Sequence, residues 1–300
     1  MTQHVALGPL LRRHNLTAEG ANLSGHGSAL VYVVRDEDGQ RQVIKDGGRR
    51  YGGSEQAWLS AHAAHPGVVD VVDELGGLLL LRWVPGPLLA ELPTGAESYA
   101  AAAGELLASL KRAPDPGAEG LSRRIIAAER LLPAAAEAEI QRCHERLTAA
   151  LAADAADRQW TYLHADFHPR NVILSSDRLV AIDPFGLAGP PAWDLAQFAA
   201  LAYGGAQSKD DAPPLSHDAI LTQLVAGFGR TPALLEEMAA YWLMLVHRMR
   251  RKLAAARAPG SMSSWRSTRA ASRAGGSAPP AARDVRPFTL AFVLWSDRVP

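Results

Sequence analysis

The sequence has a single cysteine, Cys143, among 300 residues. One thiol cannot form an intrachain disulfide, and it excludes a zinc site built from several cysteines. Long hydrophobic runs are also missing, since the longest, such as 241–246 and 288–295, are far too short to span a membrane. Residues 1–15 contain no apolar core of signal-peptide length. We therefore expect a cytoplasmic protein of a reducing compartment, with no membrane partner.

The sequence also lacks a net charge, because 31 Lys and Arg residues balance 31 Asp and Glu residues. This balance hides an asymmetry. From Arg248 onward there are 11 basic and 2 acidic residues, which leaves 20 basic and 29 acidic residues in the rest of the chain. An acidic body disfavours a nucleic acid as partner and favours a cationic small molecule.

Hydrophobic residues make up 48% of the chain and charged residues 21%, which is typical of soluble globular proteins. The length fits two modest domains. We predict an N-terminal lobe over residues 1–84, a helical lobe over 85–257 and a basic low-complexity tail over 258–300. The tail is expected to be poorly ordered, because its Ser, Ala, Arg, Gly and Pro residues cannot bury enough apolar surface. We expect a monomer.

The hydrophobic pattern predicts an α+β protein in which strands precede helices. The first 83 residues predict strands and one helix, which Ser54 caps and which ends near His65, before Pro66. The segment Pro85-Gly86-Pro87 marks the boundary between the lobes. The predicted strands cover 29–34, 42–45, 68–72 and 78–83, a short β patch covers 160–183, and the predicted helices cover 99–112, 121–132, 134–152, 193–203, 216–228 and 232–256.

The most informative segment runs from Leu163 to Asp183. Two apolar β runs flank residues 175–178, so we predict a hairpin. If its turn is centred on Asp177, Asn171 faces Asp183, with Cα atoms about 4.5–5.5 Å apart. An amide oxygen and a carboxylate at that spacing suit Mg²⁺, which takes few protein ligands and leaves the other positions to phosphate and water.

Asp166 lies five residues before Asn171, on a loop that contains Pro169. From there its carboxylate could accept the proton of an alcohol aligned with a metal-bound phosphate, and His164, Asp166 and Asn171 fit the kinase spacing His-x-Asp-x-x-x-x-Asn. Two other interpretations stay open: a metal cluster of His164, Asp166 and His168, or a hydrogen-bonded loop without catalytic meaning. We expect both histidines to brace the loop through their ring nitrogens.

A phosphate anchor is predicted in the N-terminal region. Lys45 ends a strand after the Asp38-Gly39 turn, in the position of the kinase strand lysine that contacts the α- and β-phosphates. It is one of only four lysines beside 27 arginines, which suggests a need for a compact point charge. Glu55, in the first turn of the next helix, could pair with it. The alternatives are a surface lysine and an acid stabilised by the helix dipole alone.

Two further segments are candidate nucleotide contacts. The loop Ser24-Gly25-His26-Gly27-Ser28 could cover phosphates with its backbone N–H groups, although a plain turn between strands has the same composition. Arg82 and Val84 lie where the strand 78–83 leads into Pro85, and the backbone there could bind an adenine. A core strand that ends at a linker gives the same pattern.

The segment His164-Ala165-Asp166-Phe167-His168-Pro169-Arg170-Asn171 resembles the loop His-Gly-Asp-(Leu/Phe)-His-x-x-Asn of the aminoglycoside phosphotransferase-like kinases. The segment Ile182-Asp183-Pro184-Phe185-Gly186-Leu187-Ala188-Gly189 is similar to the Ile-Asp-Pro-x-Gly-Leu-x-Gly of that family's streptomycin and hydroxyurea phosphotransferase branch. The resemblance covers residues 23–256 and is most specific over 163–196. It implies a bilobal protein-kinase-like fold, with a small antiparallel-sheet N-lobe that binds the nucleotide and a mainly helical C-lobe.

The resemblance also implies ATP as co-substrate and Mg²⁺ as cofactor, with Asp166 as catalytic base and with Asn171 and Asp183 on the magnesium. The chain departs from the family pattern at two positions. Ala165 replaces the usual glycine, which matters if that residue needs a positive φ. Pro190 replaces an Asp that is frequent in the family, so the role of that carboxylate is missing.

Asp194, at the start of the helix 193–203, is expected to cap this helix or to reach back to the backbone of the 164–171 loop. We interpret the chain as an ATP-dependent O-phosphotransferase that acts on a hydroxyl of a streptomycin-like, cationic aminoglycoside and confers antibiotic resistance. The alternatives are a metabolic small-molecule kinase of the same fold, acting on a sugar, an amino alcohol or a hydroxamate such as hydroxyurea, and a nucleotide-binding module without chemistry.

Overall fold

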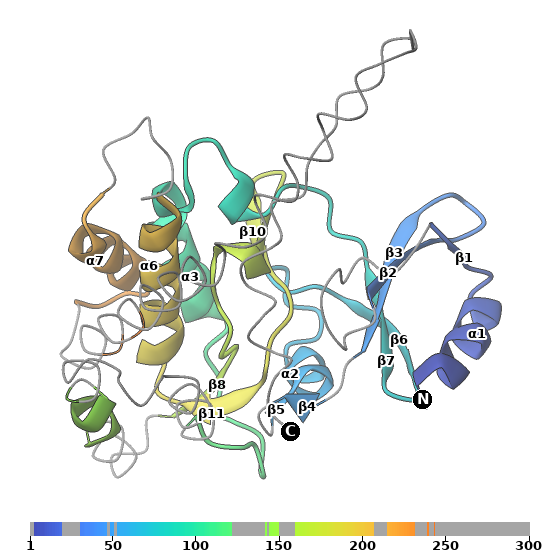
Figure 1. Ribbon diagram of the computed structural model, residues 1–300, viewed down its shortest axis with the longest axis horizontal. Helices are drawn as coiled ribbons and strands as arrows, with labels where there is room; N and C mark the ends of the chain where they lie inside the picture. The colour runs from blue at the N-terminus through green and yellow to red at the C-terminus, as the bar shows by residue number, and fades with distance from the viewer. Residues whose placement is uncertain are drawn as a thin grey trace, which may run out of the picture.

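The computed structural model describes residues 3–19, 31–46, 49–50, 53–121, 142, 144–149, 160–206, 215–231, 239 and 243. In these ranges the chain forms two lobes, an antiparallel sheet with short helices and a mainly helical part (Figure 1). The predicted α+β class and bilobal kinase-like architecture are confirmed. Several predicted elements lie outside the described residues: the loop 24–28, the tail 258–300, most of the helix 134–152, and all but a few residues of the helices 121–132 and 232–256.

The N-terminal lobe is built on a five-stranded antiparallel sheet with the order β1-β2-β3-β7-β6. Its first hairpin pairs β2 with β3 across the predicted Asp38-Gly39 turn. The edge strand β6 begins at Val71 rather than at the predicted Val68, because Val68 forms a parallel bridge with Ala181 of the other lobe. The strands are β1 (Thr17–Ala18), β2 (Val31–Arg35), β3 (Arg41–Asp46), β6 (Val71–Leu75) and β7 (Leu78–Arg82).

The apolar run of β7 faces two cores. Leu78 and Leu80 pack in one cluster with Leu10, which comes from a helix on the outer face of the sheet. Leu79 and Leu81 belong to the main core, which continues into the helical lobe. Because successive strand residues point to opposite faces, a continuous run of leucines buries both faces of this strand.

The helix on the outer face is α1 (Gln3–Arg13), so the prediction of one helix in the first 83 residues is wrong. Gly8 and Pro9 both disfavour helix interiors, and they hid this helix from a pattern analysis. Leu10 is fully buried against the sheet. Packing rather than intrinsic propensity therefore holds α1 in place.

The second N-terminal helix, α2 (Glu55–Ala61), begins as predicted, since the Ser54 side chain accepts a hydrogen bond from Ala57 N. It ends earlier than expected, at Ala61, and His62 caps it. The short strands β4 (Arg49–Arg50) and β5 (Gly53–Ser54) pair just before it.

Three helices organise the C-terminal lobe and match predicted ones. The helices α3 and α7 approach each other closely at two glycines: a Cβ on Gly104 would lie 1.9 Å from Leu224 O, and one on Gly227 would lie 2.0 Å from Ala101 O. Larger residues at either position would push the helices apart. The helical elements are η1 (Leu89–Glu91), η2 (Ala96–Tyr99), α3 (Ala100–Ser109), α6 (Ala192–Ala206) and α7 (His217–Gly227).

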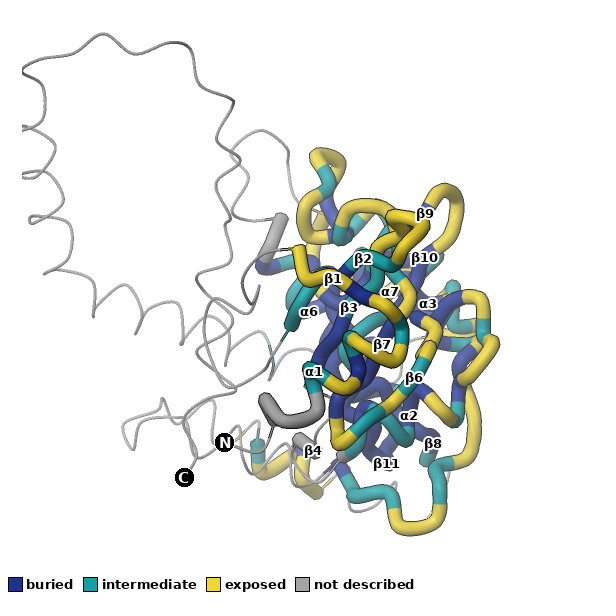
Figure 2. Tube along the Cα trace, turned by 90° about the vertical axis from the view of Figure 1, so that its right-hand side faces the viewer, coloured by how far each residue is buried: buried dark blue, intermediate teal, exposed yellow. Residues whose placement is uncertain are grey.

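Four short strands and one turn of 3-10 helix surround the segment that the sequence singled out. They are β8 (Thr161–Leu163), η3 (Pro169–Asn171), β9 (Val172–Ser175), β10 (Arg178–Ala181) and β11 (Leu187–Gly189). The strands pair as β8 with β11 and as β9 with β10. Most of residues 161–200 are buried. Figure 2 shows buried residues in dark blue in the interior of the described part and exposed ones in yellow on its outer loops.

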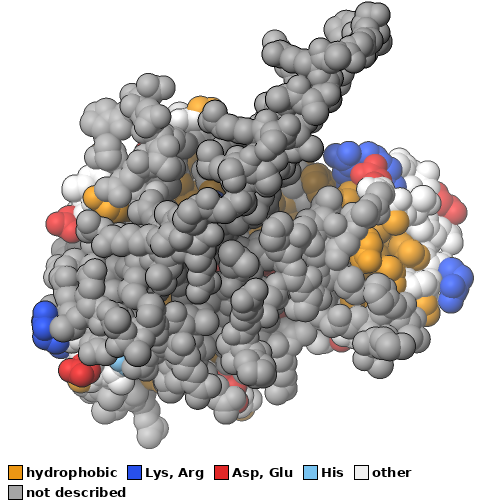
Figure 3. All heavy atoms as spheres, in the orientation of Figure 1, with side chains coloured by type: hydrophobic (Ala, Val, Ile, Leu, Met, Phe, Trp, Pro, Cys, Tyr) orange, Lys and Arg blue, Asp and Glu red, His pale blue; other side chains and the backbone are white. Residues whose placement is uncertain are grey.

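The surface of the N-terminal lobe is mixed in character. Where its described atoms are visible in Figure 3, hydrophobic side chains lie between basic and acidic ones. Within the described ranges, no helix combines the length and the apolar character that crossing a membrane requires.

Candidate active site

Lys45 lies where the two lobes meet. It is only 7% exposed, and its Nζ is 2.9 Å from Glu55 Oε1 and 2.6 Å from Asp183 Oδ1. The predicted ion pair between Lys45 and Glu55 is therefore confirmed, and the alternative of a surface lysine is wrong. One positive charge faces two carboxylates, so the group as a whole is anionic.

The helix α2 holds Glu55 in place through its contact with the other lobe. Trp58 is buried one turn after Glu55, and its Nε1 donates a hydrogen bond to Tyr162 O at 3.2 Å. The Trp58 ring also lies edge-on to His164, with the centroids 5.3 Å apart. The helix that carries Glu55 is thus attached directly to the loop that carries Asp166.

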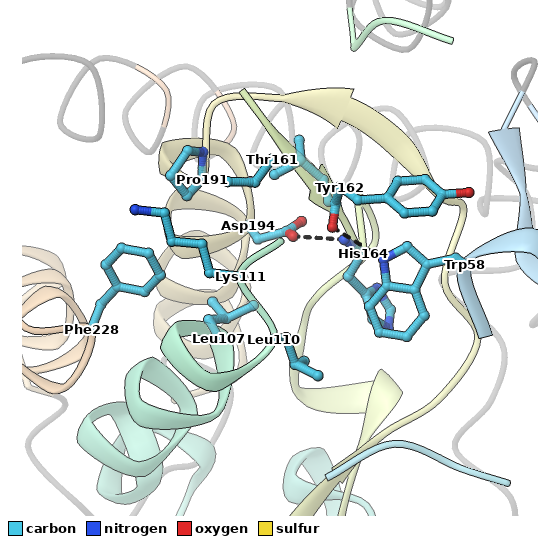
Figure 4. Close-up of a pocket in the computed structure, with 11 residues that line it drawn as sticks. Trp58, Leu107, Leu110, Lys111, Thr161, Tyr162, His164, Pro191, Asp194 and Phe228 are labelled. Carbon is cyan, nitrogen blue, oxygen red and sulfur yellow. Dashed lines mark hydrogen bonds between the residues drawn. The ribbon is translucent and has the colours of Figure 1, made fainter. Parts of the chain in front are cut away.

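Asp194 anchors the start of that loop, as the sequence predicted. Its Oδ2 accepts a hydrogen bond from His164 N (Figure 4), and its Oδ1 accepts one from Ala165 N, both at 2.8 Å. Asp194 sits in the first turn of α6 and is buried. One carboxylate therefore satisfies two buried backbone donors and fixes the loop against α6.

His164 joins the loop to the segment around Asp183. Its Nδ1 accepts from Asp166 N at 3.3 Å, so the ring proton lies on Nε2, which donates to Ile182 O at 2.9 Å. Its backbone oxygen accepts from Phe185 N. The ring is 1% exposed, and burial lowers the pKa of His164 to about 4. His164 is therefore a neutral brace, as expected.

Ala165 has a φ of +62°, in the left-handed region. A glycine reaches this conformation without a steric penalty, whereas a Cβ there costs about 1–2 kcal/mol. The departure from the family's glycine at this position is thus a strained one. The hydrogen bonds from His164 N and Ala165 N to Asp194 hold the strained backbone in place.

The Asp166 carboxylate is held by two side-chain amides. Asn171 Nδ2 donates to Asp166 Oδ2 at 3.1 Å and to Asp166 O at 3.0 Å, while Gln197 Nε2 donates to Asp166 Oδ1 at 2.9 Å. His168 lies beside it, with Nε2 3.6 Å from Oδ2, and its Nδ1 accepts from Arg170 N. His168 thus braces the loop, as predicted. All of these groups are mostly buried.

The predicted register of the β9–β10 hairpin is wrong by one residue. Val172 pairs with Ala181 and Ser175 with Arg178, so the turn consists of Ser176 and Asp177 rather than being centred on one residue. A one-residue shift turns every side chain to the other face. Asn171 consequently pairs with Ile182, whose N donates to Asn171 O, and it does not face Asp183 across the hairpin.

Asp183 follows the strand with a φ of +58° and directs its carboxylate to Lys45. Its side chain is 31% exposed, whereas that of Lys45 is 9% exposed. Electrostatic effects of both Asp166 and Asp183 reach His164, since both raise the pKa that burial lowers. The His164 ring thus joins the segments that carry Asp166 and Asp183, because it contacts Asp166 N and Ile182 O.

The remaining predicted contacts are placed less centrally or not described. Arg82 is exposed at the end of β7, and its Nε donates to Asp70 Oδ2 at 3.2 Å. Val84 is half-buried and packs on the main core, at the connection between the lobes. The loop 24–28 lies outside the described residues.

The alternative of a metal cluster at His164, Asp166 and His168 finds no support. Among the described residues, no group of three or more His, Cys, Asp or Glu side chains is arranged to hold a metal ion. A pocket does lie behind the loop, between Trp58, Lys111 and Phe228 (Figure 4). Asp166, Lys45 and Asp183 do not line it.

Gln197 was not found from the sequence. It lies three positions after Asp194 on α6, and residues three apart share one face of a helix. Once Asp194 is assigned to the loop, that spacing points to Gln197 as a second contact of α6 with the same loop.

The fold and the site together define a class of protein. A lysine–glutamate pair on a small sheet, a loop with an Asp and an Asn five residues apart, and a later Asp opposite the lysine are the parts of a kinase-type phosphotransferase. All of them meet in this chain where the lobes join.

The chain belongs to the APH family, the phosphotransferase enzyme family, which residues 21–241 match. It is 34% identical over 199 residues to the streptomycin 6-kinase of Streptomyces glaucescens, and the match covers 62% of this chain and 63% of that enzyme. The predicted resemblance to aminoglycoside phosphotransferase-like kinases is thereby confirmed, over less than two thirds of the relative's length.

Solved structures agree on the fold. The aminoglycoside phosphotransferase APH(3'')-Id from Streptomyces rimosus matches with a TM-score of 0.51 and 18% identity, over 82% of this chain and 98% of that one. A choline/ethanolamine kinase family protein from Mesorhizobium loti matches with a TM-score of 0.54 and 17% identity, over 84% of this chain and 85% of that one. Identities this low support the fold alone.

Proposed function

We propose that the protein transfers the γ-phosphate of ATP to a hydroxyl of a streptomycin-like aminoglycoside. The observation that carries this proposal is the meeting of Asp166, Asn171, Lys45 and Asp183 where the lobes join. The sequence similarity to a streptomycin 6-kinase supports the choice of acceptor. The acidic character of the chain before residue 248, with 29 acidic and 20 basic residues, also favours a cationic acceptor.

In the proposed reaction the acceptor oxygen attacks the γ-phosphorus, the bond from this phosphorus to the β,γ-bridging oxygen breaks, and ADP leaves. Asp166 takes the hydroxyl proton. Each of its carboxylate oxygens accepts one amide N–H, and a carboxylate oxygen has two lone pairs with which it can accept hydrogen bonds or a proton. Lys45 would contact the phosphates from the N-terminal lobe, with Glu55 holding its Nζ.

The donor set fits a magnesium ion. Asn171 turns its Nδ2 toward Asp166, so its Oδ1 points the opposite way. Asp183 keeps part of its carboxylate exposed, and the Lys45 group is anionic overall. Carboxylate and amide oxygens are the ligands that Mg²⁺ prefers. When bound by Asn171 and Asp183, the ion would neutralise charge on the phosphates.

The test compares wild type with Asp166→Asn and Asp183→Asn, using Mg-ATP and streptomycin. ADP release and a mass gain of about 80 Da on the drug report the transfer, as expected when a kinase adds one phosphoryl group. Loss of a general base lowers kcat by about 10²- to 10⁴-fold, and Asp166→Asn should do so with nucleotide affinity unchanged. Asp183→Asn should abolish turnover of Mg-ATP.

Asp177→Asn is the matched control, because Asp177 is an exposed residue of the β9–β10 turn. It should leave kcat unchanged. Near-wild-type turnover in either of the other two variants would remove the assignment of the site.

A second candidate is a metabolic kinase that phosphorylates an amino alcohol. A choline/ethanolamine kinase family protein has the same fold, so the fold alone does not separate the two candidates. Choline and streptomycin are both cationic alcohols, so the same acidic body suits either. A panel with streptomycin, choline and ethanolamine separates the two candidates, because only the true acceptor should gain the phosphoryl mass with a kcat/KM well above the others.

A further inference from the structure

We propose that Gln197 is a positioning residue, which holds the Asp166 carboxylate in the orientation that accepts the proton of the acceptor hydroxyl. The inference rests on the proposed function, because it assigns Gln197 a role only if Asp166 is the base. It concerns a residue of α6 that the sequence motifs do not include.

Two side-chain amides donate hydrogen bonds to the carboxylate of Asp166, one to each oxygen. Asn171 Nδ2 donates to Oδ2 at 3.1 Å, and Gln197 Nε2 donates to Oδ1 at 2.9 Å. With one donor on each oxygen, the carboxylate cannot rotate about its Cβ–Cγ bond without losing a hydrogen bond. If Gln197 is replaced by an apolar residue, the hydrogen bond on Oδ1 is lost and the carboxylate rotates more easily.

The helix α6 thus controls both the backbone and the side chain of the loop. Asp194 binds the N–H groups of His164 and Ala165, and Gln197, one turn later, binds the Asp166 side chain. Because residues three apart lie on one face of a helix, a single rigid helix sets the geometry of the base. Precise placement of this kind requires support from rigid elements.

The orientation of the Gln197 amide is fixed by chemistry. An ionised carboxylate only accepts hydrogen bonds, so Gln197 must turn its Nε2 to Asp166. Its Oε1 is then buried and finds no hydrogen-bond partner among the described residues. The side chain is only 2% exposed, so bulk water cannot satisfy this oxygen.

A buried amide oxygen without a partner costs stability. If the only role of Gln197 were to fill space in the core, an apolar side chain of similar shape, such as methionine, would do so without this cost. A buried polar residue that lowers the stability of the fold is expected at a functional site. Gln197 also donates without adding a positive charge, whereas a lysine or arginine would weaken Asp166 as a base.

The test is Gln197→Met, which preserves the length of the side chain and removes the donor. With Mg-ATP and streptomycin we expect kcat to fall by about 10- to 100-fold, the range that a small misplacement of reacting groups produces. The KM for ATP should stay unchanged, and the melting temperature should be equal or higher. Slow hydrolysis of Mg-ATP without drug, in which water replaces the alcohol, gives a second readout and should fall in parallel.

Two further variants make the outcome decisive. Leu195→Ala, in the buried face of the same helix, should lower the melting temperature and leave kcat nearly unchanged. Asp166→Asn is measured alongside. If it is inactive while Gln197→Met keeps wild-type kcat, the inference about Gln197 is overturned and the proposed function stands. If Asp166→Asn is fully active, the proposed function itself fails. A Gln197→Met variant that loses kcat only together with thermal stability, as an unfolding protein would, also overturns the positioning role.

Discussion

Lys45 and Asp183 lie 138 positions apart in the sequence, yet Lys45 Nζ is 2.6 Å from Asp183 Oδ1. Lys45 belongs to β3 in the sheet, and Asp183 follows β10 in the helical lobe. Their contact, shared with Glu55 on α2, therefore joins three elements of two lobes through one ammonium group. The contribution of this contact to the free energy of unfolding can be measured separately from its contribution to turnover.

Replacing Lys45 by methionine should lower both stability and turnover. Glu55 is 4% exposed, and removal of one partner of a buried ion pair costs about 3–5 kcal/mol because the other charge stays buried. The double variant Lys45→Met with Glu55→Gln should recover most of the free energy of unfolding and none of the activity. Denaturant unfolding and ADP release measure the two effects. Equal unfolding midpoints for wild type and Lys45→Met would contradict this account.

Asp194→Asn should weaken the loop without changing the shape of the side chain. An asparagine offers one acceptor oxygen to the two backbone donors of His164 and Ala165, and it turns an N–H₂ toward one of them. An unsatisfied buried donor costs about 1–3 kcal/mol, and a lower kcat should accompany the loss. Asp218→Asn is the control, because that exposed acid at the start of α7 contacts the His217 ring and accepts no backbone N–H from the described residues. A kcat and an unfolding free energy equal to wild type would show that Asp194 does not hold the loop.

The local part of the site was predictable from sequence, and the contacts between elements were less so. The spacing of His164, Asp166 and Asn171 fixed their place on one loop, and the strand–turn–helix order placed Lys45 and Glu55 close enough to pair. Both follow from residues near each other in the chain. The contact of Asp194 with the loop also followed from its position at the start of a helix that succeeds the loop.

The prediction of the β9–β10 register was wrong for a specific reason. Residues 175–178 read Ser-Ser-Asp-Arg and contain no glycine that would select a turn type. Ser176 adopts a φ of +57° despite this, and the two-residue turn moves the pairing by one position. Gln197 and α1 were missed because their roles depend on tertiary packing. The role of a glutamine in a helix can be inferred only when the residues that it contacts are known. The same is true of a helix that contains Pro9.

Ala165→Gly should stabilise the protein. The φ of +62° at Ala165 costs an alanine about 1–2 kcal/mol, and glycine removes this cost while adding some entropy to the unfolded chain. We expect a net gain of about 0.5–1 kcal/mol with activity retained. Ala102→Gly, inside the regular helix α3, should instead lose about 1 kcal/mol. Opposite signs for the two substitutions, measured by denaturant unfolding, test the conformational argument, and a loss at both sites would refute it.

The stability of the protein should fall as the pH drops from about 6.5 to about 4. Burial lowers the pKa of His164 from 6.5 to about 4, and burial also lowers the pKa of His62. Between these values the unfolded chain binds a proton that the folded protein excludes, so the stabilisation is complete above pH 6.5 and decreases as the pH falls toward 4. One group shifted by this much accounts for roughly 3 kcal/mol, at about 1.4 kcal/mol per pH unit.

His164→Gln should therefore flatten the pH dependence of the unfolding free energy in this window, even though the variant is less stable at pH 7. NMR gives a direct check on the same group in the wild type, because the His164 ring signal should stay at its neutral position down to about pH 4. A ring that titrates near 6.5 would mean that protonation does not disturb the bonds to Asp166 N and Ile182 O. The assignment of His164 as a neutral, Nε2-protonated link between the segments of Asp166 and Asp183 would then be incorrect.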